Sequence, residues 1–202
     1  MWKNKGSGRI FQILAITGSV GFVVFYAIAA YHYPGGSDEH PSSIQFSFFE
    51  NYWCDLLSTY SKNGSINNGK PYAIVAQFFL NITLLSTWIF TAGNHHSTKH
   101  WNMKLILTGS FSTLFANFTA TSYHDLYIAL SVLFGLLAIY QIRSIHKKNN
   151  RNILFLSGTV GMAMILLNCL LYYFDIAKYL LPLLQKITFA YMLVWFLLNL
   201  RK

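Results

Sequence analysis

Six apolar stretches separated by short polar segments make up most of the chain. They cover residues 10–31, 72–92, 105–122, 126–142, 153–174 and 180–200. An α-helix needs about 20 apolar residues to cross about 30 Å of hydrocarbon, and these stretches are close to that length. The pattern predicts an all-α integral membrane protein, a bundle of about six transmembrane helices that forms a single domain over residues 1–202.

A different pattern lies between the first two stretches. Residues 46–60 place aromatic and leucine side chains on one half of a helical wheel, and Asn51, Cys54 and Asp55 on the other half. This predicts an amphipathic outer interfacial helix between the first and second spans. Its polar half carries no Lys or Arg, unlike a helix that faces anionic lipid headgroups. We therefore expect this half to face protein and to cover a polar site.

Two other segments have distinctive sequences. Residues 61–71 contain two Asn-Gly pairs and a proline, which favour turns and predict a hinge-like linker. The third apolar stretch, 105–122, is rich in Ser and Thr. Hydrocarbon offers hydroxyl groups no hydrogen-bond partner, so we expect this helix to lie inside the bundle.

The composition agrees with a membrane protein, because 54% of the 202 residues are hydrophobic and only 10% are charged. The net charge of +9 is also found in nucleic-acid-binding proteins. Here, however, the cations lie in short segments between apolar stretches, as the positive-inside rule describes. We expect membrane lipids as partners, protein subunits of a membrane complex as a further class, and no nucleic acid.

The alternation of basic segments predicts a multi-pass protein of the cell membrane with both termini in the cytoplasm. This topology assigns a depth to each polar residue within a span. Seven polar residues are expected in one layer on the outer side, where they would line an outward-facing ligand-binding pocket: Asn51, Gln77, Asn81, Asn117, Asn168, Gln185 and Lys186.

Lys186 is the most demanding member of this layer. A charge at bilayer depth costs at least about 2.5 kcal/mol, so the ammonium needs water, a counter-ion or a route to the interface. One interpretation pairs Lys186 with Asp55 or Asp125 inside the pocket. The alternative is that its side chain extends alone to the interface.

The adjacent residues His124 and Asp125 also have two interpretations. They can simply begin the fourth helix, where a carboxylate favours the positive end of the helix dipole. Alternatively, His124, Asp125 and Asp55 are catalytic residues, acting as proton donors and acceptors. Imidazole and carboxylate also suit zinc, and the candidate metal ligands are His32, Asp55 and His124.

Histidines 95, 96 and 100 form a second cluster, but neighbouring lysines disfavour a cation there. We expect this cluster to lie in a solvated loop. The two cysteines, Cys54 and Cys169, permit one disulfide at most, and the sequence leaves open whether they are bridged or free.

Four short motifs suggest a family. They are the Tyr33-Pro34-Gly35 end of the first span, the segment NYWCDLL from residue 51, the HDL turn at 124 and LLQKITF from residue 183. Together they resemble a bacterial and archaeal membrane family that carries the domain of unknown function 998. Members resemble one another in an Asn-x-x-x-Asp-Leu segment, although the family's frequent Ser-Asp-Leu-Gly is Cys-Asp-Leu-Leu here.

A more distant similarity is to the alkaline ceramidase and adiponectin-receptor hydrolases. That resemblance implies a helical bundle with an intramembrane zinc site held by three histidines. This chain lacks the HxxxH motif on its last span.

Three functional hypotheses follow. The first is a multi-pass membrane protein that binds a lipid or small molecule, or acts as a subunit of a membrane complex, through its outward-facing polar pocket. The second is a metal-dependent hydrolase of lipid amides or esters in the outer leaflet, with zinc as cofactor. The third is a small proton-coupled carrier, which the absence of an inverted repeat makes the weakest of the three.

Overall fold

The computed structural model describes residues 5–94, 99–118, 121 and 123–201. In this part of the chain there are six α-helices and two short 3₁₀ helices, with no strand beyond isolated β-bridges. The α-helices are α1 (Lys5–Tyr31), α2 (Lys70–Asn94), α3 (Lys99–Ala116), α4 (His124–Lys148), α5 (Asn152–Tyr173) and α6 (Leu181–Asn199), and the 3₁₀ helices are η1 (Cys54–Leu57) and η2 (Lys178–Leu180). The predicted all-α class is confirmed.

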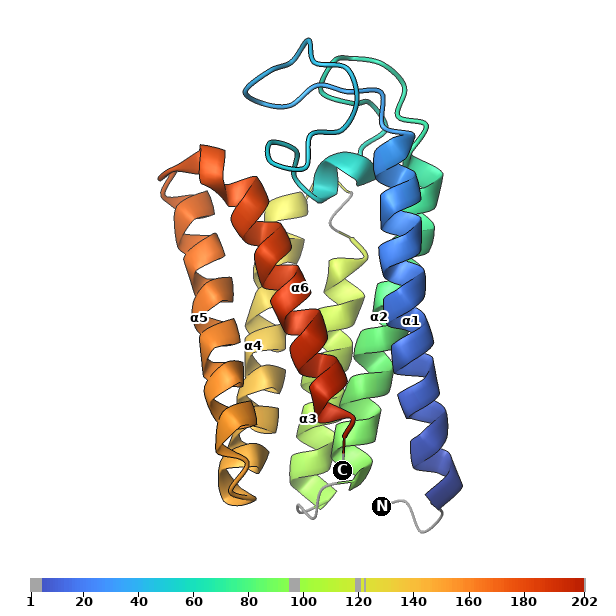
Figure 1. Cartoon of the computed structure of the whole chain (residues 1–202). Helices are drawn as coiled ribbons and strands as arrows, with labels where there is room; N and C mark the ends of the chain where they lie inside the picture. Colours follow the sequence, from blue (N-terminus) through green and yellow to red (C-terminus); the bar gives the residue numbers. More distant parts are fainter. Residues whose placement is uncertain (1–4, 95–98, 119–120, 122, 202) are drawn as a thin grey trace.

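The six helices run side by side as one bundle (Figure 1). Five of them, all except α3, are long and apolar enough to cross a membrane. Helix α3 has 18 residues and would span about 27 Å at 1.5 Å per residue. It is shorter than expected at its C-terminal end, because the helix stops at Ala116 and Asn117 and Phe118 form a turn.

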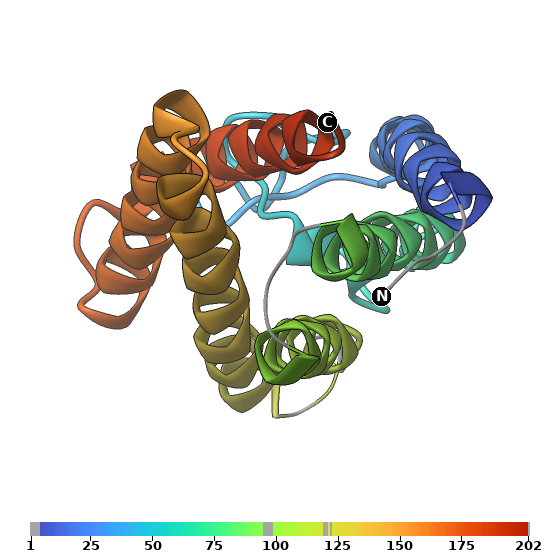
Figure 2. The ribbon, with the colours of Figure 1, turned by 90° about the horizontal axis from the view of Figure 1, so that it is seen from below.

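Helix α3 does not lie in the centre of the bundle, contrary to the prediction. Seen along the helices (Figure 2), it is at the periphery beside α2 and α4, on the opposite side from α6. Its hydroxyl groups avoid hydrocarbon in another way. Thr108 and Thr113 donate to carbonyls of their own helix, and Ser112 donates to the Ser131 carbonyl of α4 at 2.8 Å. These hydrogen bonds to backbone carbonyls therefore allow a helix rich in Ser and Thr to lie at the periphery of the bundle.

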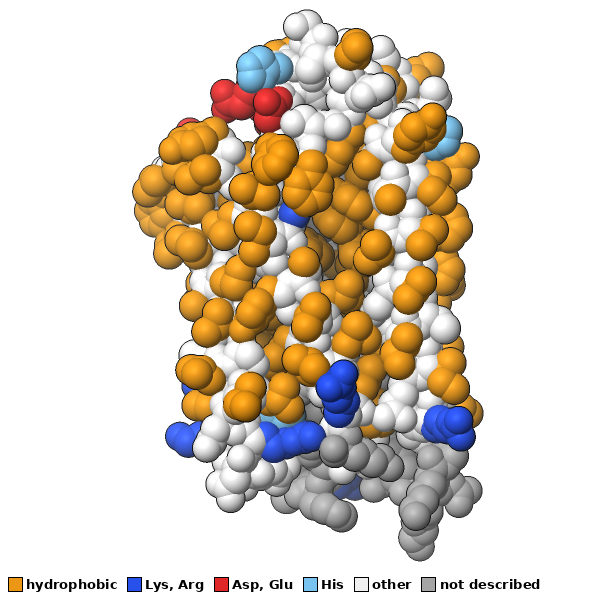
Figure 3. Space-filling model, viewed as in Figure 1, with side chains coloured by type: hydrophobic (Ala, Val, Ile, Leu, Met, Phe, Trp, Pro, Cys, Tyr) orange, Lys and Arg blue, Asp and Glu red, His pale blue; other side chains and the backbone are white. Residues whose placement is uncertain are grey.

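The two ends of the bundle differ in charge. We call residues 32–69 the cap, the end that they cover the outer end, and the opposite end, where residues 149–151 join α4 to α5, the inner end. Acidic side chains appear at the outer end and most Lys and Arg side chains at the inner end, with a hydrophobic band between them (Figure 3). Helix α1 begins and α6 ends at the inner end (Figure 1).

The hydrophobic band includes many large side chains that face outward. Helix α5 is the extreme case, because Gly158 and Gly161 are its only buried residues among those described. A side-chain carbon at Gly158 would meet the Trp195 ring of α6 at 2.7 Å, and one at Gly161 would meet the Met192 thioether. The two glycines therefore let α6 approach α5 closely.

The predicted amphipathic helix over residues 46–60 is wrong. The cap is an irregular chain whose one helical turn in this region is η1. The side chains of Asn51 and Asp55 instead stabilise turns by binding backbone amides nearby in sequence, and the Tyr52 amide is one that a helix over 46–60 would need for its own hydrogen bond. Asn51 Oδ1 accepts from the Ser47 amide at 2.9 Å, and Asp55 Oδ2 accepts from the Tyr52 amide at 2.8 Å. Such local bonds compete with helix formation.

Residues 61–71 are not a hinge-like linker either. Asn67 is 3% exposed, and its side-chain amide lies within 3.3 Å of the carbonyl oxygens of Asp55, Leu56 and Ser58. Its Oδ1 atom accepts from the Gly69 amide at 2.9 Å. One buried side chain thus joins η1 to the start of α2 and fixes the fold of the cap.

Candidate functional site

A cavity of about 580 Å³ lies within the bundle under the cap. All six helices and the cap contribute to its wall. Its inner part is mostly apolar, with Trp88, Ile139, Met192 and Phe196 among the lining residues. Ser112 and Ser131 also line it, but their hydroxyls donate to backbone carbonyls of the neighbouring helix. Small-molecule pockets in proteins typically have about 300–1,000 Å³, so this cavity has the size of a ligand site.

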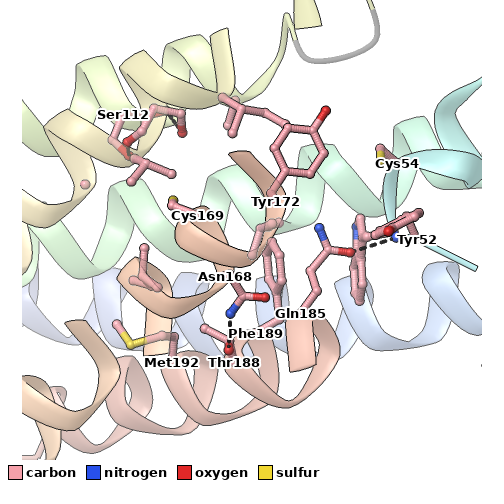
Figure 4. Close-up of a pocket in the computed structure, with 18 of the residues that line it drawn as sticks. Tyr52, Cys54, Ser112, Asn168, Cys169, Tyr172, Gln185, Thr188, Phe189 and Met192 are labelled. Carbon is pink, nitrogen blue, oxygen red and sulfur yellow. Dashed lines mark hydrogen bonds between the residues drawn. The ribbon is translucent and has the colours of Figure 1, made fainter. Parts of the chain in front are cut away.

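The outer part of the cavity is polar. Its lining residues include Tyr52, Cys54, Asp55, His124 and Tyr172. Figure 4 shows the labelled side chains of α5 and α6 along one side, running from Met192 through Thr188 to Gln185 toward the cap. The cavity also reaches Asp38 and Lys62, whose side chains are exposed, so it opens at the outer end.

Asn168 of α5 and Thr188 of α6 form a polar group in this wall (Figure 4). The Asn168 amide donates to Thr188 Oγ1 at 2.8 Å, and the Thr188 hydroxyl donates to its own helix at Leu184. The Asn168 Oδ1 atom is buried and accepts no hydrogen bond from the part of the chain that is described. An unsatisfied acceptor of this kind is costly unless a donor reaches it.

The cap is attached to α6 by two polar contacts. The Trp53 amide donates to Gln185 Oε1 at 3.0 Å, and the Lys186 ammonium donates to the Asn51 carbonyl. The Trp53 ring also stacks on Phe189 of α6, with ring centroids 5.0 Å apart. Gln185 and Asn51, both expected to bind a ligand, therefore also hold the roof of the cavity in place.

Lys186 is 4% exposed and does not extend to the interface alone. It forms no ion pair with Asp55 or Asp125 among the contacts of the described residues, so the predicted pairing is wrong as well. Instead its ammonium donates to the Asn51 and Pro182 carbonyls and lies over the rings of Phe46 and Phe48, 5.6 and 5.2 Å from their centroids. Carbonyl dipoles and aromatic faces take the place of a carboxylate.

Asp55 lines the cavity but is largely engaged within the cap. Its Oδ2 atom accepts from the Tyr52 amide and from Asn51 Nδ2, the latter at 3.1 Å. Lys62 Nζ lies 3.7 Å from Oδ1. Burial raises the pKa of Asp55 above its ordinary value, although the Asn51 bond and the Lys62 charge oppose this shift. Asn51, which is fully buried, also donates to the Gly36 carbonyl, so the pair has a structural role.

His124 and Asp125 begin α4 and are joined to α5. His124 Nδ1 lies 2.9 Å from Asp125 Oδ1, which also accepts from the Tyr172 hydroxyl at 2.8 Å. Tyr173 donates to the Asp125 carbonyl. His124 and Tyr172 line the cavity, whereas Asp125 is not among its lining residues and 64% of its side chain is exposed. Of the predicted catalytic residues, Asp55 and His124 thus line the cavity, and Asp125 lies outside it, hydrogen-bonded to the imidazole of His124.

The predicted metal ligands do not form a site. His32 is exposed and stacks on Tyr72, with ring centroids 4.9 Å apart, and it does not line the cavity with Asp55 and His124. Across the described residues, no group of three or more His, Cys, Asp and Glu side chains is placed to hold a metal. Histidines 95 and 96 lie outside the described residues, and His100 is exposed in the first turn of α3. These donors do not fit a zinc site.

Three amides of the predicted polar layer form a chain between α2 and α3. Gln77 donates to Asn81 at 3.4 Å, and Asn81 donates to Asn117 at 2.6 Å. Gln77 lines the cavity, whereas Asn117 is exposed at the end of α3. Of the seven residues predicted to bind a ligand, Gln77, Asn168 and Gln185 line the cavity, whereas Asn51, Asn81, Asn117 and Lys186 are not among its lining residues.

The two cysteines are free and both line the cavity. Burial raises the pKa of the Cys54 thiol to about 12. A thiol with so high a pKa is a poor nucleophile, because the thiolate is the reactive form.

Sequence reasoning missed Asn67, Thr188 and Tyr172. Asn67 was hidden by its place beside an Asn-Gly pair, which is typical of exposed turns. Thr188 and Asn168 lie on different helices, so only their packing brings them together. The Tyr172 hydroxyl donates to Asp125 at the start of α4, and no local sequence pattern indicates this contact between two helices.

No family model, curated protein or solved structure matches the chain. The two family resemblances drawn from short motifs therefore stay predictions.

Proposed function

We propose that the protein binds an amphiphile, a lipid-like molecule with one apolar chain and a small polar head, in the cavity under the cap. The observation that carries this proposal is the division of the 580 Å³ cavity into an apolar inner part and a polar outer part. An apolar chain would lie against Trp88, Met192 and Phe196. The head would meet the Asn168–Thr188 pair, where a hydroxyl or amide hydrogen would satisfy the free Asn168 oxygen.

The cavity is proposed to open toward the outside of the cell membrane. Two observations support this orientation, which places both termini in the cytoplasm. Five helices are long and apolar enough to cross a membrane. The basic side chains gather mostly at the inner end and the acidic ones at the outer end (Figure 3). Single cysteines at Glu39 and Lys148, in a protein whose native cysteines are replaced by serine, test it. An impermeant maleimide added to cells should label position 39 and not position 148, and the reverse result would overturn the topology.

Ligand binding is tested by extracting the purified protein with solvent and identifying retained amphiphiles by mass spectrometry. Val132→Phe places a ring in the cavity, whereas Leu133→Phe places the same ring on an outward-facing position that is 54% exposed. We expect at least a fivefold loss of the retained molecule in the first variant and none in the second. Equal retention by both variants would refute the proposal.

A second candidate is a metal-free hydrolase, favoured by His124, which lines the cavity and is hydrogen-bonded to Asp125. A carboxylate behind an imidazole orients it as a general base. If this function holds, purified protein should hydrolyse a long-chain ester or amide, and His124→Gln should abolish turnover while the amphiphile is still retained. Retention without turnover in the wild type would leave binding as the function.

A further inference from the structure

Two cations of α4 share one aromatic ring of α5 at the inner end. Arg143 Cζ lies 4.6 Å from the centroid of the Phe155 ring, and Lys147 Nζ lies 5.6 Å from the same centroid. Residues four apart face the same side of a helix, and like charges at this spacing repel each other. The ring thus holds two positive charges close together at the inner end, on the side of α4 and α5 that faces away from the core of the bundle.

The hydrogen-bonding capacity of this pair is largely unused. A guanidinium has five donors and an ammonium three. Arg143 Nε is buried without a hydrogen-bond partner, and neither Arg143 nor Lys147 forms an ion pair with any described residue. Because Nε is buried, the groups that remain available to an anion are the terminal nitrogens of the half-buried Arg143 and the ammonium of the exposed Lys147.

The chain itself supplies no acidic side chain for them. All six Asp and Glu residues fall within the described residues, and all belong to the cap or to the outer ends of α4 and α5. They are Asp38, Glu39, Glu50, Asp55, Asp125 and Asp175. No Asp or Glu side chain therefore neutralises the two cations at the inner end, and an anionic group of another molecule would do so.

The surface beside the pair indicates which molecule. Leu137 and Tyr140 on α4 and Leu156 on α5 are 45%, 50% and 63% exposed, and all three lie toward the outer end from the cations. Apolar side chains exposed in this way suit acyl chains, while cations at their border suit a headgroup. A lipid standing against α4 and α5 would meet both at once.

We propose that Arg143, Lys147 and Phe155 form a binding site for the phosphate of an anionic phospholipid in the leaflet at the inner end. The guanidinium binds phosphate oxygens through its planar fork, the ammonium adds a second charge, and the ring fixes both side chains. This site is separate from the cavity under the cap, so it does not depend on the proposed function.

The test compares lipid binding by three variants using native mass spectrometry. The protein in detergent is titrated with phosphatidylglycerol or phosphatidylcholine. Arg143→Gln with Lys147→Gln removes the site, whereas Lys99→Gln with Lys104→Gln removes the same charge from exposed positions of α3 at the same end. The wild type should retain phosphatidylglycerol in preference, and the first variant should bind it at least about tenfold more weakly, while the second changes by less than about threefold.

Phe155→Leu separates this site from general attraction, because it leaves the net charge unchanged. We expect it to weaken phosphatidylglycerol binding several-fold without affecting phosphatidylcholine. Equal losses in the two double variants, together with no loss in Phe155→Leu, would show non-specific attraction and overturn the proposal. The melting temperature of each variant in phosphatidylcholine verifies its fold, and Phe155→Leu decides the matter if the Arg143 and Lys147 double variant unfolds.

Discussion

Asn67 is the side chain on which we expect the cap to depend most. Its amide contacts three backbone carbonyls and its Oδ1 atom accepts one amide, so Asn67→Ala leaves up to four buried backbone groups without this partner. A net contribution of about 1 kcal/mol per hydrogen bond, with two donor hydrogens shared among the carbonyls, gives a loss of about 3 kcal/mol. Since 1.4 kcal/mol is a factor of ten, the open cap should become about 100-fold more populated.

Hydrogen–deuterium exchange over residues 51–69 measures this population, because local opening exposes the protected amides. Asn68→Ala is the matched control, since the adjacent Asn68 is exposed and has no side-chain hydrogen bond among the described residues. Exchange in the cap should accelerate about 100-fold in the first variant relative to the second, with α5 unchanged in both. A difference of less than about threefold would refute the reasoning that Asn67 organises the cap.

Three other changes test the packing and charge of the structure. Trp53→Ala removes a ring that stacks on three others and should lower the free energy of unfolding by about 3 kcal/mol. Phe49→Ala, at a residue that is 65% exposed, should lower it little. Urea titration would compare the two variants, and equal losses would contradict the role of Trp53 in holding the cap on the bundle. Burial raises the pKa of Asp55, so its contribution to cap stability is present at acidic pH and is lost as pH rises through that pKa. Asp55→Asn should therefore reduce the fall in melting temperature as pH rises above the ordinary Asp pKa of about 4, and an unchanged profile would contradict the shift. Gly158→Ala should lower the melting temperature more than Gly161→Ala, because the rigid Trp195 indole cannot move aside as the flexible Met192 thioether can. The opposite order would contradict this steric reasoning.

The helices could be predicted from the sequence because each depends mainly on its own composition. The apolar stretches 10–31, 153–174 and 180–200 lie within a few residues of α1, α5 and α6. A helix in hydrocarbon must satisfy its backbone internally, so length and hydropathy are enough to find it. Polar residues made the boundary less accurate in α3, which ends at Ala116 although the sequence predicted a helix to residue 122.

The cap and the cavity could not be predicted in the same way. The apolar residues of 46–60 recur with the period of a helix. The side chains of Asn51 and Asp55, however, bind the amides of Ser47 and Tyr52 and stabilise turns in place of a helix. The cavity depends on how each helix is rotated, and its wall combines residues as distant in sequence as Trp53 and Gln185. Lys186 shows the limit clearly, because its partners are backbone carbonyls, which exist at every position and leave no pattern in the sequence.

The sparse packing of α5 has a consequence for how the gene can vary. A helix whose fully buried residues are two glycines can exchange its outward-facing side chains for other apolar ones at little cost, whereas Leu154, Met162 and Ile165 still pack against the core. A saturation library should therefore tolerate nearly any aliphatic or aromatic residue at the outward-facing positions of α5, with exceptions at the two glycines and at positions that line the cavity, such as Ile165, Asn168 and Tyr172. Sequence divergence on this helix would carry little information about ligand, and the few intolerant positions would carry most of it.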